Sequence, residues 1–354
     1  MAAPFAALIA PPTTVAVTGA NGFLAQHCIA SLLDHGYRVI GTVRDARKAD
    51  VVKATHKDHE GLAVVIIPNI SDAANIHQTL TPYHPEACLH LAAPFSYTAT
   101  DFEAELMVPA TEGTRAVLAA MDALGSVRRV VHTSSFASIL DANAKPVTSK
   151  IYTAEDWSPL TYEDGVKAKT VAEAYRASKV AAEKVAWDYV KSHQPSFDLV
   201  SLCPAMVFGP FLNHSVPKSI GGLNTSNSLV WGAIHDAGDG AIPPTRGPVW
   251  VDVRDVAHAH LKSIIVPEAG GKRLLVAASM YSNQELVDVS RQRLPQWNAK
   301  IAVGEPGQRD TGVLYDIDAS ETRRLLEMNW RGLGDCLEAL VPQLFEIEAT
   351  GKGT

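Results

Sequence analysis

Short apolar runs rich in β-branched residues alternate with longer amphipathic stretches along the first two thirds of the chain. The first run, Val15 to Val17, leads into a glycine-rich turn and then into an apolar-periodic segment that continues to Leu33. Similar runs predict strands at 38–43, 63–67, 87–92, 127–133 and 199–202, with helical patterns between most of them. This alternation predicts an α/β fold with a doubly wound parallel sheet and helices on both faces.

The turn after the first predicted strand has the spacing GxxGxxA, with Gly19, Gly22 and Ala25. Glycines allow a tight turn and the close approach of a pyrophosphate, and a small third residue lets the helix pack on the sheet, so that the helix N-terminus faces the phosphates. An ordinary glycine-rich turn without a ligand is the alternative. The position of the GxxGxxA turn between a strand and a helix favours nucleotide binding.

The end of the second predicted strand indicates which dinucleotide is bound. An NAD site usually has a carboxylate there, whereas NADP needs a cation for its 2′-phosphate. Arg44 ends this strand and Lys48 lies one helical turn beyond it, which favours NADPH. Asp45 is an objection, since it could repel the phosphate or contact a ribose, and an arginine at a strand end is common.

Tyr175 and Lys179 are four residues apart, so on a helix both side chains can point into the same cleft. A tyrosine with an ordinary pKa of about 10 is a weak acid at neutral pH, and a neighbouring ammonium lowers that pKa. The same spacing would also occur on any amphipathic helix. The interpretation as an acid and its neighbouring cation is favoured because the pair follows both the glycine turn and the stretch Thr133-Ser134-Ser135.

Composition describes an ordinary globular protein. Of the 354 residues, 47% are hydrophobic and 19% are charged, and the net charge of -7 includes no block of like charges, which gives no reason to expect binding to nucleic acid or to a membrane. Four widely spaced cysteines and an N-terminus without the basic start of a signal peptide predict a cytoplasmic protein.

Further motifs carry a family resemblance. They are Leu91-Ala92-Ala93-Pro94, the segment 204–210 and the segment 251–257. With the turn at Gly19, Arg44, Tyr175 and Lys179, the chain resembles the extended short-chain dehydrogenase/reductases. It looks closest to the branch of plant dihydroflavonol reductases and fungal methylglyoxal and ketone (aldehyde) reductases, over about residues 15–261.

The resemblance implies that Ser135, Tyr175 and Lys179 are the catalytic residues. Ser135 would orient the carbonyl, Tyr175 would be the acid, and Lys179 would tune the tyrosine and hold the nicotinamide ribose. Hydroxyl donors aimed at a carbonyl oxygen stabilise the negative charge that develops there. Ser134 is a rival for the serine role, and Ser135 is preferred because the family places the second serine of the pair at the active site.

The motifs and the resemblance together give a set of cofactor contacts. These are Gly19, Asn21, Gly22, Phe23, Leu24, Arg44, Lys48, Asn69, Ile70, Leu91, Ala92, Ala93, Thr133, Tyr175, Lys179, Pro204 and Val207. Asn69 departs from the family, which often has an aspartate there to bond the adenine amine. An asparagine oxygen still accepts that bond, without the charge.

Phe95, Phe136 and Met206 each follow a motif at the carboxyl edge of the sheet, so we expect them to line an apolar substrate pocket. Met206 could equally be a core gap filler. Few charged residues accompany them, which favours a neutral or weakly polar carbonyl compound over a sugar nucleotide. His258 and His260 are two apart on a predicted helix and face different sides, so no metal site is expected.

The domain boundaries follow from these assignments. We expect a tail at 1–12, an NADP-binding Rossmann domain at 13–207, and a smaller, C-terminal substrate lobe in two parts, 208–247 and 279–354. Between them, residues 248–278 should return to the main sheet, rejoining it at about Val249 to Val253. Trp297 and Trp330 are expected in the second part of the lobe.

The sequence therefore predicts an NADPH-dependent reductase that transfers hydride to a small, mostly apolar aldehyde or ketone and yields a chiral alcohol. It is expected to act as a monomer or homodimer. A sugar-nucleotide epimerase or dehydratase with tightly bound NAD would use the same three catalytic residues, but Arg44 and the lack of basic residues near the pocket argue against it. A non-catalytic NADP-binding redox sensor would tend to lose the tyrosine or the lysine.

Overall fold

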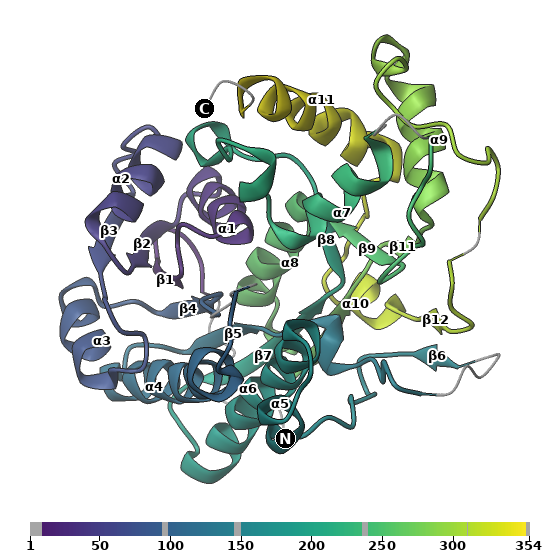
Figure 1. The fold of residues 1–354 in the computed structure, drawn as a ribbon. Coiled ribbons are helices and arrows are strands. Elements are labelled where there is room, and N and C mark those ends of the chain that lie inside the picture. Colours follow the sequence, from purple (N-terminus) through teal and green to yellow (C-terminus); the bar gives the residue numbers. More distant parts are fainter. Residues whose placement is uncertain (1–8, 94–97, 145–149, 236–239, 310, 352–354) are drawn as a thin grey trace.

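A seven-stranded parallel sheet forms the centre of the molecule (Figure 1). The computed structural model describes residues 9–93, 98–144, 150–235, 240–309 and 311–351. The strand order is β10-β7-β5-β4-β1-β2-β3. From β1 the chain adds strands towards one edge and then, from β4 on, towards the other, which confirms the doubly wound α/β fold. The strands are β1 (Thr14–Thr18), β2 (Arg38–Val43), β3 (Leu62–Ile66), β4 (Ala87–His90), β5 (Arg129–Thr133), β7 (Asp198–Pro204) and β10 (Arg273–Val276).

Helices cover both faces of this sheet. One face carries α1 (Phe23–Asp34), α2 (Ala46–Thr55) and α8 (Val253–Ile265), and the other carries α3 (Ala73–Leu80), α4 (Val108–Leu124) and α6 (Val171–His193). Successive residues of a strand therefore enter different cores. Val131 packs on the α1 and α8 side, whereas Val130 packs on the α3 and α4 side. Burial on both faces explains why the strands are continuous apolar runs.

A smaller lobe gathers around a second sheet of order β11-β9-β8. Its elements are β8 (Met206–Phe208), β9 (Val249–Asp252), β11 (Ser279–Met280), α7 (Thr225–Ile234), α9 (Asn283–Arg293) and α11 (Leu333–Gly351). Phe208, Trp250 and Tyr281 are fully buried at its centre, and the ring of Phe208 packs against both of the other two. This aromatic core is separate from the two cores of the main sheet.

The expected return to the main sheet at Val249 to Val253 is wrong. This run forms β9, which pairs with β8 and β11, and the chain rejoins the main sheet only at β10, beside β7. A β-branched run indicates a strand but not its partner.

Two further expectations about the domain boundaries need correction. Trp330 packs against the core of the main sheet, with Leu326 and Met328, whereas Trp297 lies in the lobe as expected. The tail is also partly anchored, because Ile9 is buried in the same main core and its carbonyl accepts a hydrogen bond from the Tyr37 hydroxyl at 2.8 Å.

Further short elements lie between these. They include a π-helical turn (Glu103–Met107), the 3-10 turn η3 (Phe136–Ser138), α5 (Tyr162–Val166), α10 (Ser320–Leu325), and the two-stranded pair β6 (Ile151–Tyr152) and β12 (Asp316–Ile317). Among the described helices, none is both long and apolar enough to cross a membrane.

Candidate active site

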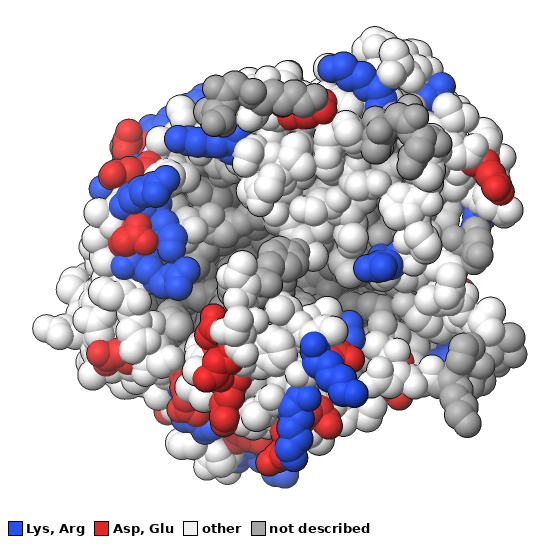
Figure 2. All heavy atoms as spheres, viewed as in Figure 1, with Lys and Arg blue, Asp and Glu red and all other residues white. Residues whose placement is uncertain are grey.

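A cavity of about 1670 Å³ lies where the carboxyl ends of the main strands meet the lobe. Figure 2 shows this face of the molecule hollowed at its centre. Eleven of the predicted site residues line the cavity: Leu24, Leu91, Ala93, Thr133, Ser135, Phe136, Tyr175, Lys179, Pro204, Met206 and Val207. Phe95 lies outside the described residues. The cavity is larger than the usual range of about 300–1,000 Å³ for a single small ligand, so there is room for part of a dinucleotide and a substrate together.

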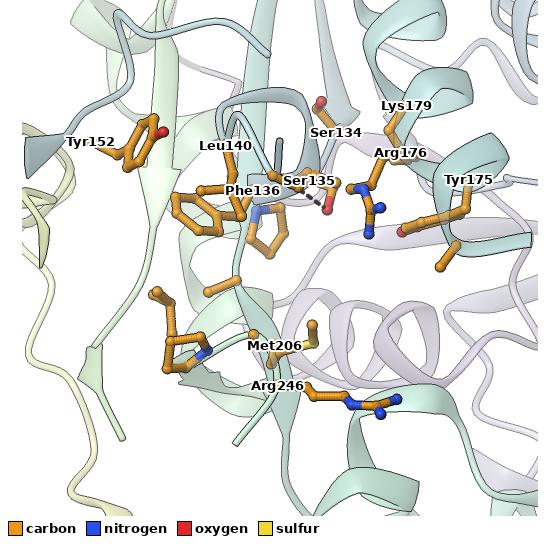
Figure 3. Close-up of a pocket in the computed structure, with 18 of the residues that line it drawn as sticks. Ser134, Ser135, Phe136, Leu140, Tyr152, Tyr175, Arg176, Lys179, Met206 and Arg246 are labelled. Atoms are coloured by element: carbon orange, nitrogen blue, oxygen red, sulfur yellow. Dashed lines mark hydrogen bonds between the residues drawn. The ribbon is translucent and has the colours of Figure 1, made fainter. Parts of the chain in front are cut away.

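Tyr175 and Lys179 reach the cavity from the same face of α6. A capping box between Thr170 and Glu173 fixes the start of the helix, which places Tyr175 in its second turn. The Tyr175 ring points into the cavity with its hydroxyl towards the side that carries Ser135 (Figure 3).

Lys179 is buried, and its Nζ donates a hydrogen bond to the carbonyl oxygen of Thr133, at the end of β5, at 2.8 Å. Burial lowers the pKa of Lys179 to about 8, and the negative charge of Glu183, one turn further along the helix, opposes that shift. The ammonium is therefore mostly charged at neutral pH. A cation held in a dry site beside a phenol is what favours the phenolate form of a tyrosine.

The two neighbouring serines face different surroundings. The Ser134 hydroxyl donates to Oε2 of the buried Glu183 at 2.6 Å. Both serines line the cavity, but the Oγ of Ser135 accepts a hydrogen bond from the backbone N–H of Ala137 at 3.1 Å. Because this contact uses a lone pair of Ser135, its proton can be donated to a carbonyl oxygen.

Glu183 is a structural centre that the sequence reasoning missed. Its carboxylate accepts from the hydroxyls of Ser134, Ser138 and Ser201, each at 2.6 Å, and from Nε of Arg273 at 2.8 Å. Burial alone would raise the pKa of Glu183, but the hydrogen bonds and the charge of Arg273, with the serine hydroxyls, lower it to about 2. The spacing of four from Lys179 was a signal that could have placed Glu183 on the same helix face.

The glycine turn has the geometry that a phosphate site requires. Gly19 has φ +66°, and a Cβ at this position would lie 3.0 Å from Cα of Ala92, two residues after β4. Among the described residues, no side chain caps the N-terminus of α1, which starts after Gly22, whereas Asp45 caps α2 and Thr170 caps α6. The first N–H groups of α1 therefore remain for an anion.

Cations gather over α2, beside the hollow (Figure 2). The Asp45 carboxylate accepts the backbone N–H of Lys48 at 3.0 Å and pairs with its Nζ at 3.4 Å. This carboxylate, which could have repelled a phosphate, therefore caps the helix and is paired with a cation. Arg44 and Arg47 are exposed and make no ion pair with any described residue. Arg47 was missed by the sequence reasoning.

Three other predicted cofactor residues have partners of their own. The Asn69 Oδ1 accepts the backbone N–H of Ser71 at 3.0 Å, which leaves its second lone pair and its amide N–H groups for an adenine. The Phe23 ring packs on Phe211 of the lobe, with 5.1 Å between the ring centroids, so the backbone of Phe23 rather than its ring belongs to the turn. The side chain of Ile70 is half-buried and faces Gly113 of α4.

The far wall of the cavity is aromatic. Phe136 packs edge-on against Tyr152, with 6.2 Å between ring centroids, and Tyr315 packs against both. The pairing of β6 with β12 brings Tyr152 and Tyr315 together. No motif marked either tyrosine, because their meeting depends on a contact between segments more than 160 positions apart in the sequence. Met206 lines the cavity and also packs beside Gly247 in the lobe.

Five charged residues also line the cavity, which the sequence reasoning did not expect. They are Asp141, Lys150, Asp156, Arg176 and Arg246. Arg176 and Arg246 point into the space from opposite walls (Figure 3).

A doubly wound sheet, an uncapped glycine turn and a serine, a tyrosine and a lysine around one cavity define a dinucleotide-dependent oxidoreductase of the short-chain type. Residues 15–277 match the model of the NAD dependent epimerase/dehydratase family, and the chain belongs to that family. The resemblance predicted from the sequence is confirmed.

The relatives include fungal reductases. The NADPH-dependent methylglyoxal reductase GRE2 of Saccharomyces cerevisiae is 32% identical, over 95% of this chain and 99% of its own. The ketoreductase azaE of Aspergillus niger is 31% identical, over 94% and 97%. The crystal structure of yeast methylglyoxal/isovaleraldehyde reductase Gre2 complexed with NADPH has a TM-score of 0.87 and 31% identity, and covers 96% of this chain and all of that one.

Proposed function

We propose that this protein is an NADPH-dependent carbonyl reductase that converts a small aldehyde or ketone into a chiral alcohol. The observation that carries the proposal is the convergence of Ser135, Tyr175 and Lys179 on one cavity. The relatives named as NADPH-dependent methylglyoxal reductase and as ketoreductase, which span nearly the whole chain, support the same reaction.

The chain's own residues would stabilise the negative charge that develops on the carbonyl oxygen and would supply the proton that this oxygen takes up. Bound NADPH supplies the hydride. As the carbonyl oxygen becomes negative, Ser135 donates a hydrogen bond to it and Tyr175 transfers its phenolic proton. Lys179, charged and held by the Thr133 carbonyl, stabilises the phenolate that remains. Loss of one donor of this kind typically costs about 2.7–4 kcal/mol of transition-state stabilisation.

The residues present fit NADPH. Gly19 allows the close approach at the turn, and no described side chain caps the N-terminus of α1. Arg44, directly after β2, and Arg47, in the first turn of α2, offer cations for the 2′-phosphate. This set also argues against the alternative of an epimerase with bound NAD. The presence of all three catalytic residues argues against a non-catalytic sensor.

A carbonyl panel tests the proposal. Purified protein should oxidise NADPH faster than NADH when given aldehydes, diketones and keto esters. Tyr175→Phe should abolish turnover while NADPH still binds, as measured by calorimetry. No turnover of any carbonyl by the wild-type protein would refute the reductase function, and full activity of Y175F would refute the role of Tyr175.

We further propose a cytoplasmic location and a monomer or homodimer that acts on small molecules rather than on nucleic acid. All four cysteines are buried and form no disulfide in the described part of the chain, which suits a reducing compartment. Analytical ultracentrifugation would report the oligomeric state.

A further inference from the structure

In the part of the chain that the structure describes, two arginines of the cavity have no ionic partner. Arg176 directly follows Tyr175 on α6, and Arg246 lies in the loop before β9. Neither forms an ion pair with a residue that the structure describes. The other charged lining residues are engaged: Lys150 pairs with Asp156, and Asp141 accepts the backbone N–H of Asn143 at 3.0 Å.

Arg176 is the more constrained of the two. Its Nε is buried and has no hydrogen-bond acceptor among the described residues. The nearest carboxylate on its own helix, that of Glu173, accepts the backbone N–H groups of Lys169 and Thr170 at 2.9 and 3.2 Å and does not pair with Arg176. Native structures usually supply an acceptor to a buried donor, so an acceptor brought by a ligand would complete this site.

The direction of the two side chains places that acceptor in the substrate half of the cavity. The Arg176 guanidinium lies on the side of Ser135 and Tyr175, and Arg246 reaches in from the opposite wall, beyond Met206 (Figure 3). The phosphate-binding elements, the Gly19 turn and Arg44, belong to β1, α1 and β2. Neither arginine is on these elements, so the cofactor phosphates are not their expected partner.

We infer that the substrate is a carbonyl compound that also carries a carboxylate, an oxo acid, whose carboxylate binds Arg176 while its carbonyl faces Ser135 and Tyr175, and that Arg246 adds a second positive charge from the opposite wall. The inference rests on the proposed reductase function. A planar guanidinium fork matches a carboxylate with two hydrogen bonds. A phosphate dianion fits less well, because Asp141 lines the same cavity without an ion pair to any described residue and would repel the second charge.

The test compares each acid with its own uncharged ester. A series from 2-oxopentanoate to 5-oxohexanoate is assayed with NADPH beside the matching methyl esters, and kcat/KM of acid over ester is the readout. For at least one chain length the wild-type protein should prefer the acid about tenfold or more. Arg176→Gln should remove that preference, Arg246→Gln should reduce it, and Arg176→Lys should retain part of it. Lys169→Gln removes an exposed charge near α6 outside the cavity and should leave the ratio unchanged.

The outcomes separate the inference from the function on which it rests. Reduction of the esters without preference for any acid would overturn the oxo-acid inference and leave the reductase intact. An acid preference that R176Q retains would overturn the role of Arg176. If R246Q weakens NADPH binding in calorimetry, Arg246 serves the cofactor and its part in the inference is wrong. No turnover of any carbonyl would refute the proposed function itself.

Discussion

Ser134 and Ser135 both line the cavity, but the Ser134 hydroxyl donates to Glu183, whereas the Ser135 hydroxyl accepts from the backbone of Ala137. We expect Ser135→Ala to lower kcat about 10²–10³-fold, because the developing oxyanion loses a donor, while the melting temperature changes little. Ser134→Ala should instead cost about 1 kcal/mol of unfolding free energy, because Glu183 loses one of its donors. Steady-state kinetics and thermal melts of both variants measure this, and the reverse pattern would make Ser134 the catalytic serine.

Arg44 is expected to set the cofactor preference. Arg44→Glu should weaken NADPH binding about tenfold or more and NADH binding much less, because only NADPH carries the 2′-phosphate. Lys53→Glu, at an exposed position in the last turn of α2, makes the same change of charge further from the end of β2 and is the matched control. An unchanged preference in R44E, measured by fluorescence titration, would assign the phosphate to other residues such as Arg47.

At the scale of elements, the turn between β1 and α1 depends on Gly19 for two separate reasons. Its backbone is left-handed, and an added Cβ would meet the backbone of Ala92. Gly125, at the end of α4, has nearly the same φ (+64°) but open space around it. Both Gly→Ala variants should lose about 1–2 kcal/mol of unfolding free energy through the left-handed backbone.

Only Gly19→Ala should lose more than that and also weaken NADPH binding, because its turn must shift away from β4. Urea denaturation and calorimetry would measure the two effects. Equal losses in both variants would mean that the contact with Ala92 is unimportant.

The sequence was sufficient for six of the seven strands of the main sheet, all but β10, and for the placement of Tyr175 and Lys179 on one wall of the cavity. Strands such as β2 and β5 are β-branched runs bounded by turns, and Tyr175 and Lys179 are linked by helical periodicity alone. The rest depended on long-range pairing. Val249 to Asp252 is a strand in any interpretation, but only the folded chain places it beside β8 and β11. The aromatic wall at Tyr152 and Tyr315 was hidden for the same reason.

At the scale of the whole molecule, the buried pair of Glu183 and Arg273 joins α6 to β10, the edge strand of the main sheet. Arg273 also donates to the carbonyls of Ala154 and Ser138, so the segments that border the cavity are bound to the same pair. Glu183→Gln should lower the unfolding free energy at pH 7 by about 3–5 kcal/mol, because Arg273 is left without its charge partner. Glu112→Gln, in the exposed pair with Arg115, should cost less than about 1 kcal/mol.

The same pair predicts that the free energy of unfolding depends on pH in the acid range. The pKa of Glu183 is lowered to about 2 in the folded protein, against about 4.3 for an unperturbed glutamate, so the folded state holds fewer protons on this group. Its stabilising contribution is complete above about pH 4.3 and is lost as the pH falls towards 2. The difference between wild type and E183Q in urea denaturation should therefore shrink within that window, and a constant difference would contradict the assignment.

Helix α6 carries both the residues of the proposed reaction and an arginine of the proposed substrate recognition, on different faces. Tyr175, Lys179 and Glu183 follow one another at intervals of four along one face, where a substitution would disturb either proton transfer or stability. Arg176 is turned about 100° from that face and meets the cavity without belonging to this row. Under the proposed roles, selection or engineering can exchange the accepted carbonyl compound through positions such as Arg176 and Arg246 without rebuilding the proposed reaction.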